Sequence, residues 1–266
     1  MRLGEAVRRH SVRDDGDGPL MVLVHGMEAN WQSWSRFAER LGGRWRIDAV
    51  EMPWRTGSEY TWGRQGSAGT WLGAALSGLG EAPAVVVGHS LGANAVLEAL
   101  SADGAVAVRA AVLLAPSYRP ADCTLSWEFF EDAKHAFRAQ IGDGLRTWLG
   151  RRRPVDEQLL DTMLAKLLER VGPVAFTEWF SHFAASTDIP AEKLAAPVLV
   201  LGGWTDPVVA NGRAEALAAR LPAATLALAG HYDHFCHIKQ ASEVAREVTR
   251  FLAASRVTLD TEGSVA

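Results

Sequence analysis

The chain has 266 residues, 48% of them hydrophobic, which is enough to bury one substantial core. Its formal net charge of −4 gives no basis for a nucleic-acid surface or an anionic-membrane patch, and its two cysteines do not make a disulfide framework. Residues 1–9 lack the apolar stretch of a secretion signal, and no run approaches the length of a membrane span, so we expect a cytoplasmic protein without nucleic-acid or membrane partners.

Predicted strands and helices alternate along the first part of the chain. We expect a strand or hairpin at residues 5–12, a strand that ends at His25, a helix at 34–41 and a strand at 46–52. A long loop at 53–69 and a helix through Leu76 then lead to an apolar strand at 84–87, a helical stretch at 93–100 and a strand at 108–115.

An insertion of about eighty residues separates the strand that ends at 115 from the next strand, far more than a simple crossover needs. Its predicted helices cover residues 127–140, 156–171 and 173–185. The apolar run 196–203 and the segment 224–229 predict two further strands before a last helix. We therefore predict a single α/β core at 1–116 and 197–255, a helical insertion at 117–196 and a flexible tail at 256–266.

The pentapeptide Gly88-His89-Ser90-Leu91-Gly92 lies between an apolar strand and a helical stretch. On such a tight turn the strained backbone directs the serine hydroxyl outward, and the glycines leave space where a Cβ would not fit. We interpret Ser90 as a nucleophile; the alternative is a structural turn with an idle serine. A serine hydroxyl needs a histidine to take its proton and a carboxylate to orient that histidine.

Candidates for both partners lie downstream. Asp206 follows the apolar run 196–203, at the carboxyl end of a predicted parallel strand, where open α/β sheets place their active-site loops. After the strand at 224–229, three histidines compete for the role of base: His231, His234 and His237. Three histidines at this spacing could ligate zinc, but no second ligand group such as His-Glu-x-x-His occurs, so we expect no metal and no cofactor. Cys236 is not on a strand-to-helix turn, and we interpret it as part of a pocket wall.

With a serine, an acid and a histidine in this order, the chain resembles the α/β-hydrolase superfamily over about residues 20–252. Members often end with a catalytic histidine, two residues, a second histidine and a helix ending in Phe-Leu. His234 and His237 match that spacing best, and His231, directly after Gly230, is the second choice for the base. The resemblance implies an α/β-hydrolase fold, with a mostly parallel sheet flanked by helices and a helical cap at 117–196 over the active-site mouth.

The resemblance also implies an oxyanion hole made of two main-chain N–H groups. One comes from Leu91, directly after the serine, and the other from Met27, after the strand that ends at His25-Gly26. In one loop the chain departs from the family pattern, because Trp54 stands where Asp-x-Pro-Gly-x-Gly-x-Ser has its first glycine. This departure puts any close subfamily assignment in doubt.

Aromatic side chains are concentrated in the insertion and in the loop at 53–69. Each is individually more typical of a core, but together they favour a roomy, apolar pocket for a hydrophobic acyl or polycyclic small molecule. The residues that we assign to substrate binding are His25, Trp54, Trp127, Phe130, Trp179 and Phe183.

The predicted function is that of a serine hydrolase that cleaves an ester, thioester or lactone of a hydrophobic substrate through an acyl-enzyme on Ser90. One alternative keeps the fold for a non-hydrolytic reaction in natural-product biosynthesis, such as cyclisation, elimination or acyl transfer. Others are hydrolysis of a carbon–carbon bond and a receptor that retains a slow triad. Epoxide hydrolases and haloalkane dehalogenases are disfavoured because superfamily members with that chemistry place Asp where this chain has Ser90.

Overall fold

The computed structural model describes residues 7–14, 17–150, 156–208 and 212–257. These residues form a seven-stranded sheet in the order β1-β3-β2-β4-β5-β6-β7. The first strand pairs antiparallel with its neighbour and all other pairs are parallel, which confirms the predicted fold class. The strands are β1 (Arg8–Arg13), β2 (Leu20–Val24), β3 (Arg46–Glu51), β4 (Val85–His89), β5 (Ala110–Leu114), β6 (Val198–Gly203) and β7 (Ala224–Ala229).

The central strands are buried on both faces because their sequences are almost entirely apolar. Every residue of β2, β4, β5 and β6 is buried, as expected for parallel strands covered by helices on both sides. β7 lies at the edge of the sheet and is exposed along its first half. Since the parallel strands share one direction, the loops that follow β2, β4, β6 and β7 meet at one end of the sheet.

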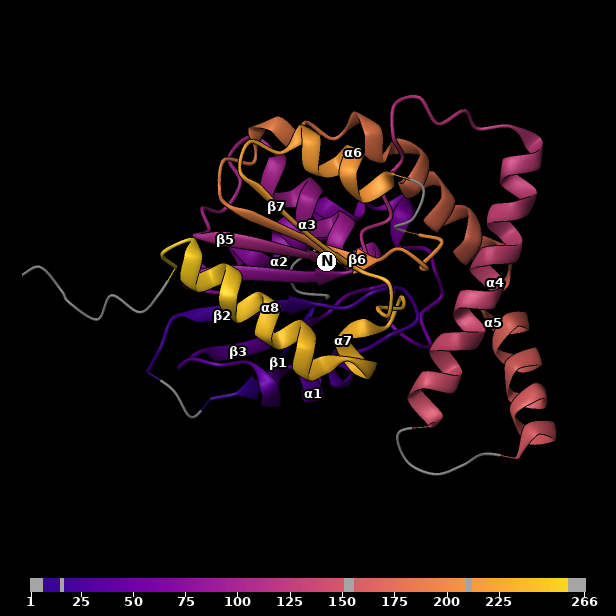
Figure 1. Ribbon diagram of the computed structural model, residues 1–266. Helices are drawn as coiled ribbons and strands as arrows, with labels where there is room; N and C mark the ends of the chain where they lie inside the picture. Colours follow the sequence, from indigo (N-terminus) through magenta and orange to yellow (C-terminus); the bar gives the residue numbers. More distant parts are fainter. Residues whose placement is uncertain (1–6, 15–16, 151–155, 209–211, 258–266) are drawn as a thin grey trace, which may run out of the picture.

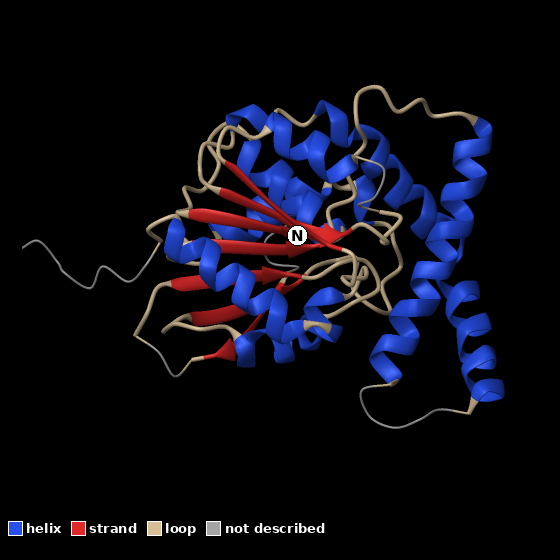
Figure 2. Ribbon diagram, viewed as in Figure 1, coloured by secondary structure: helices blue, strands red, loops and turns tan. Residues whose placement is uncertain are grey.

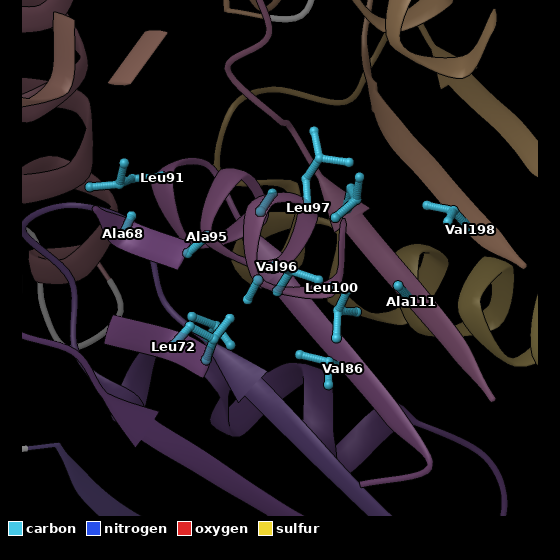
Figure 3. Close-up of a cluster of buried hydrophobic side chains, with 14 of the residues drawn as sticks. Ala68, Leu72, Val86, Leu91, Ala95, Val96, Leu97, Leu100, Ala111 and Val198 are labelled. Carbon is cyan, nitrogen blue, oxygen red and sulfur yellow. The ribbon is translucent and has the colours of Figure 1, made fainter. Parts of the chain in front are cut away.

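Helices cover both faces of the sheet (Figure 1). They are α1 (Ser35–Arg40), α2 (Ala68–Ser77), α3 (Leu91–Ser101), α6 (Arg213–Arg220), α7 (Cys236–Lys239) and α8 (Ala241–Ala254). Helices α2, α3 and α6 pack on one face, and α1 and α8 on the other. Figure 3 shows Val96, Leu97 and Leu100 of α3 gathered with Leu72 of α2 and Val86 of β4 in one apolar cluster.

Two long helices, α4 (Trp127–Leu149) and α5 (Glu157–Ala185), pack against each other beside the carboxyl ends of the parallel strands (Figure 2). We call them the helical pair. The side chains of Ser126 and Asp156 cap their amino ends. Helix α5 is broken at Gly172, which has φ +59°, directly before Pro173, because proline cannot continue the hydrogen-bond ladder. The break falls where the two predicted helices meet.

The ends of several elements differ from the prediction. Helix α4 continues to Leu149, well beyond the predicted end at 140, and β1 begins at Arg8. The predicted tail begins too early, because Val257 is only 2% exposed and packs in the core beside α8. The predicted parts of the first strand at residues 5–6 and of the tail at 258–266 lie outside the described residues.

No helix within the described ranges combines the length and the apolar character that crossing a bilayer requires.

Candidate active site

Ser90 occupies the turn between β4 and α3 in a conformation that residues with a side chain rarely adopt, with φ +53° and ψ −122°. Its N–H donates a hydrogen bond to the carbonyl oxygen of Leu114 (2.9 Å). A Cβ added at Gly88 would overlap the main chain of Gly92, and one added at Gly92 would overlap the carbonyl oxygen of Val24. The turn therefore requires both glycines, and it places Ser90 at the carboxyl end of β4.

We expect Gly92→Ala to lower the free energy of unfolding by about 3 kcal/mol or more, because the new methyl group would displace the main chain of β2. Gly73→Ala in α2 is the matched control, since a Cβ there meets open space and alanine is the better helix former. Urea unfolding at 25 °C measures both changes. Equal stabilities of the two variants would contradict this account of the turn.

Three loops bring Ser90, Asp206 and His234 together. His234 Nε2 lies 3.0 Å from Ser90 Oγ, and His234 Nδ1 lies 2.8 Å from Asp206 Oδ2. The Asp206 side chain is fully buried, and its Oδ1 accepts a hydrogen bond from the N–H of Val208 (3.0 Å). One carboxylate oxygen is thus fixed by the loop while the other faces the imidazole. This arrangement can hold the ring with a proton on Nδ1 and leave Nε2 to accept the serine proton.

A further histidine, His89, supports the loop that carries His234. Its Nε2 lies 2.7 Å from the carbonyl oxygen of His234, and the two rings are 4.9 Å apart between centroids. Burial is the main reason why the pKa of His89 lies well below its ordinary value. The ring is therefore neutral near pH 7, and its Nε2–H donates to that carbonyl. Sequence reasoning did not assign this role, although His89 stands inside the serine motif.

The other members of the histidine cluster face different partners. His231 is largely exposed and its Nε2 lies 2.7 Å from Glu243 Oε2. His237 is buried, with its ring 4.1 Å from that of His89. Within the described ranges, no three His, Cys, Asp or Glu side chains are grouped so that they could hold a metal ion. Cys236, expected in a pocket wall, packs in the core instead, and burial raises the pKa of its thiol to about 12.

The two expected oxyanion donors, Met27 and Leu91, belong to the segments that follow β2 and β4. Met27 follows β2 and lines the same cavity as Ser90, and Leu91 begins α3. Neither the N–H of Met27 nor that of Leu91 donates to another main-chain group in the part of the chain that the structure describes. Neither group is therefore committed to a main-chain acceptor, as is needed in a donor to a bound oxygen.

A cavity of about 220 Å³ lies between the sheet and the helical pair and reaches Ser90 and His234. Its wall is mainly apolar. The helical pair contributes six apolar lining side chains: Phe137, Ile141, Leu145, Trp148, Leu167 and Trp179. Glu28, Gln140 and Phe235 also line it, and no motif in the sequence pointed to them. Periodicity shows which face of a helix is apolar but not whether that face meets the core or a cavity.

Of the aromatic residues expected to bind substrate, only Trp179 lines this cavity. The structure places Trp127 in solvent, 83% exposed at the start of α4. Phe130 and Phe183 pack with other rings of the helical pair, Phe130 against Phe176 (5.1 Å) and Phe183 against Trp179 (5.8 Å). These three expectations are corrected: Phe130 and Phe183 help to join the two helices, and Trp127 lies at the exposed start of α4.

His25 and Trp54 do not line the cavity either. Their side chains instead join the loop that follows β2 to the loop that follows β3. The N–H of Met52 donates to His25 Nε2 (3.0 Å), so the ring proton is on Nδ1, which donates to the carbonyl oxygen of Gly26 (2.8 Å). Trp54 is fully buried and donates through Nε1–H to the carbonyl oxygen of His25 (2.9 Å). Their expected contacts with substrate are therefore replaced by structural hydrogen bonds.

Acid should destabilise the protein partly through His25, because its burial lowers its pKa to about 4. The unfolded chain binds this proton near pH 6.5, so the stabilisation is complete above pH 6.5 and is lost as the pH falls toward 4. The shift corresponds to about 3 kcal/mol. We expect the free energy of unfolding, measured in urea, to fall by about that much more in the wild type than in His25→Asn across this window. If the wild type and His25→Asn lost the same free energy of unfolding between pH 6.5 and 4, His25 would not be a source of the acid sensitivity.

Sheet order, the serine-bearing turn and the converging loops define the class of α/β-hydrolase-fold enzymes. A family model described as "Alpha/beta hydrolase family" matches residues 21–247. The chain therefore belongs to the alpha/beta hydrolase family.

Individual relatives agree with this assignment. A pimeloyl-[acyl-carrier protein] methyl ester esterase of Methylococcus capsulatus (strain ATCC 33009 / NCIMB 11132 / Bath) is 28% identical over 265 residues, covering 92% of this chain and 98% of the relative. Two solved structures share the fold at 20% identity. A bacterial membrane phospholipase A has a TM-score of 0.68, with 97% of this chain and 89% of that chain covered. Bromoperoxidase from Bacillus anthracis has a TM-score of 0.66, with 93% and 94% covered.

Proposed function

We propose that the protein is a serine hydrolase that cleaves carboxylic esters of hydrophobic acyl groups through an acyl-enzyme on Ser90. The observation that carries this proposal is the contact chain from Ser90 Oγ to His234 to Asp206, at 3.0 Å and 2.8 Å, on the wall of an apolar cavity. Ester hydrolysis is also the activity for which the Methylococcus relative is named. Thioesters and lactones contain the same reacting carbonyl and belong to the proposed substrate class.

The proposed mechanism has two halves. His234 Nε2 takes the proton of Ser90 Oγ as the oxygen attacks the carbonyl carbon, and Asp206 stabilises the imidazolium. The negative oxygen accepts hydrogen bonds from the N–H groups of Met27 and Leu91. The bond to the leaving alcohol breaks as His234 returns the proton to the alcohol oxygen. In the second half, His234 takes a proton from water as the water oxygen attacks the acyl carbon. The bond to Ser90 Oγ then breaks, His234 returns the proton to Oγ, and the acid leaves.

We propose that the helical pair acts as a cap that forms the acyl pocket. Six apolar or aromatic side chains of the pair line the cavity, together with the polar side chain of Gln140. Each methylene removed from water contributes about 0.8 kcal/mol, so this wall favours longer alkyl chains over short or charged ones.

A panel of p-nitrophenyl esters tests the proposal. Hexanoate has four more methylenes than acetate, so we expect its kcat/KM to be at least about tenfold higher. Leu167→Ala removes apolar surface from the cavity wall, so it should lower the preference for hexanoate over acetate. Leu159→Ala removes an exposed side chain from the same helix and should leave that preference unchanged. A preference for short charged acyl groups would overturn the proposed substrate class. A product of a natural substrate that does not gain water would favour cyclisation or elimination instead.

A further inference from the structure

Glu28 is strained and buried directly beside Met27. Its φ of +55° lies in the left-handed region, which costs a residue with a side chain roughly 1 kcal/mol. Its main chain is held on both sides, since its N–H donates to the carbonyl oxygen of Trp54 (3.1 Å) and its own carbonyl accepts from Thr56 Oγ1 (2.8 Å). Strain that persists in a well-fixed turn is characteristic of functional positions.

The Glu28 carboxylate forms an ion pair with Arg170 of α5. Glu28 Oε2 accepts a hydrogen bond from Arg170 Nη2, and the Glu28 side chain is only 6% exposed. Its other oxygen, Oε1, is buried without a hydrogen-bond partner among the described residues, while the main chain of Gly57 gives the carboxylate a smaller stabilisation than Arg170 does. A charge buried in this way depends on its partner, so Arg170 is the main compensation for Glu28.

The position of Arg170 links this pair to the cavity. Arg170 lies at the end of the first half of α5, just before the break at Gly172. Leu167 and Trp179, on the two sides of the break, line the cavity. Met27 also packs against the apolar cluster of the helical pair. The turn that carries Met27 is therefore attached to α5 twice, by apolar packing and by a buried charge.

We propose that the Glu28–Arg170 pair is a positioning device, which ties this turn to α5 and holds the Met27 N–H where the oxyanion forms. The inference rests on the proposed function, because it needs Met27 to be an oxyanion donor. Donors of this kind act only when they are fixed in place before the charge develops. Without the pair the turn can relax, so the transition state loses stabilisation while the apolar walls still bind the acyl group.

Three variants separate this role from a purely structural one. Glu28→Gly removes the carboxylate at a backbone conformation that glycine prefers, so the turn should fold normally. Arg170→Met removes the partner, and the double variant completes a mutant cycle. Lys166→Met is the matched control, because it removes an equally charged, exposed side chain from the same helix.

Two readouts are needed: kcat and KM for the hexanoate ester, and the rate constant for phosphonylation of Ser90 by a fluorophosphonate, which also develops negative charge on oxygen. We expect each single variant to lose at least about tenfold in kcat and in labelling rate, with KM changed less than about threefold. The double variant should be no slower than the slower single variant, and Lys166→Met should match the wild type.

A Glu28→Gly variant as fast as the wild type, or losses that multiply in the double variant, would overturn the inference and leave the proposed function intact. A wild type that is not labelled at all would overturn the proposed function, and the inference with it.

Discussion

Ser90→Ala is expected to lower kcat for ester hydrolysis by roughly 10⁴- to 10⁶-fold, because the acyl-enzyme cannot form without the hydroxyl. The residual rate would come from the oxyanion donors and the cavity, which remain in place. Alanine can occupy the turn as serine does, so the variant should unfold at a temperature close to that of the wild type.

The control for this variant is Ser77→Ala, which removes an exposed hydroxyl at the end of α2. It should keep the wild-type kcat. Retention of more than about one hundredth of the activity in Ser90→Ala, with a purified sample free of wild-type enzyme, would exclude Ser90 as the nucleophile.

Asp206→Asn is expected to lower kcat about 10⁴-fold while leaving the loop intact. The asparagine carbonyl can still accept from the N–H of Val208, as Asp206 Oδ1 does now. Its amide NH₂ then replaces Oδ2 opposite His234 Nδ1, which must become the acceptor. The ring proton moves to Nε2 and faces Ser90, so the ring can no longer accept the serine proton.

Asp233→Asn provides the comparison for Asp206→Asn. Asp233 lies in the same loop as His234, but among the described residues its carboxylate accepts hydrogen bonds from the N–H of Phe235 (2.9 Å) and from Lys239, and not from the His234 ring or Ser90. We expect its kcat to stay within about threefold of the wild type. Similar losses in the two asparagine variants would mean that the acid acts on loop structure and not on the imidazole.

The fold could be predicted well from the sequence because the strands are local features. The runs at β2, β4, β5 and β6 are apolar except for His89 at the end of β4, and a helix follows each of β2, β4 and β6. The candidate nucleophile could be placed for a similar reason, since two glycines two residues from Ser90 encode a tight turn within five residues.

The choice of base and the pocket wall could not be settled in this way. His231 and His234 follow the same strand, and only the path of the loop decides which ring turns toward Ser90 and which toward Glu243. Trp127 and Trp179 are both tryptophans of the same insertion, yet Trp127 is exposed and Trp179 lines the cavity. Long-range packing decides such cases, and a periodic pattern carries no information about it.

Glu28 illustrates the same limit in the backbone. A glycine in the left-handed region can be anticipated from its sequence, but a glutamate there cannot, because charged residues rarely adopt that conformation. Its partner Arg170 lies on another element far along the chain, so neither residue is distinctive in the sequence alone.

The central claim is that Ser90 is the residue that becomes acylated. The most direct measurement is the intact mass of the protein after incubation with a fluorophosphonate, followed by peptide mapping. The account predicts one adduct per chain, located on Ser90 and absent from Ser90→Ala. An unmodified wild-type protein, or an adduct on a different residue that persists in Ser90→Ala, would contradict it.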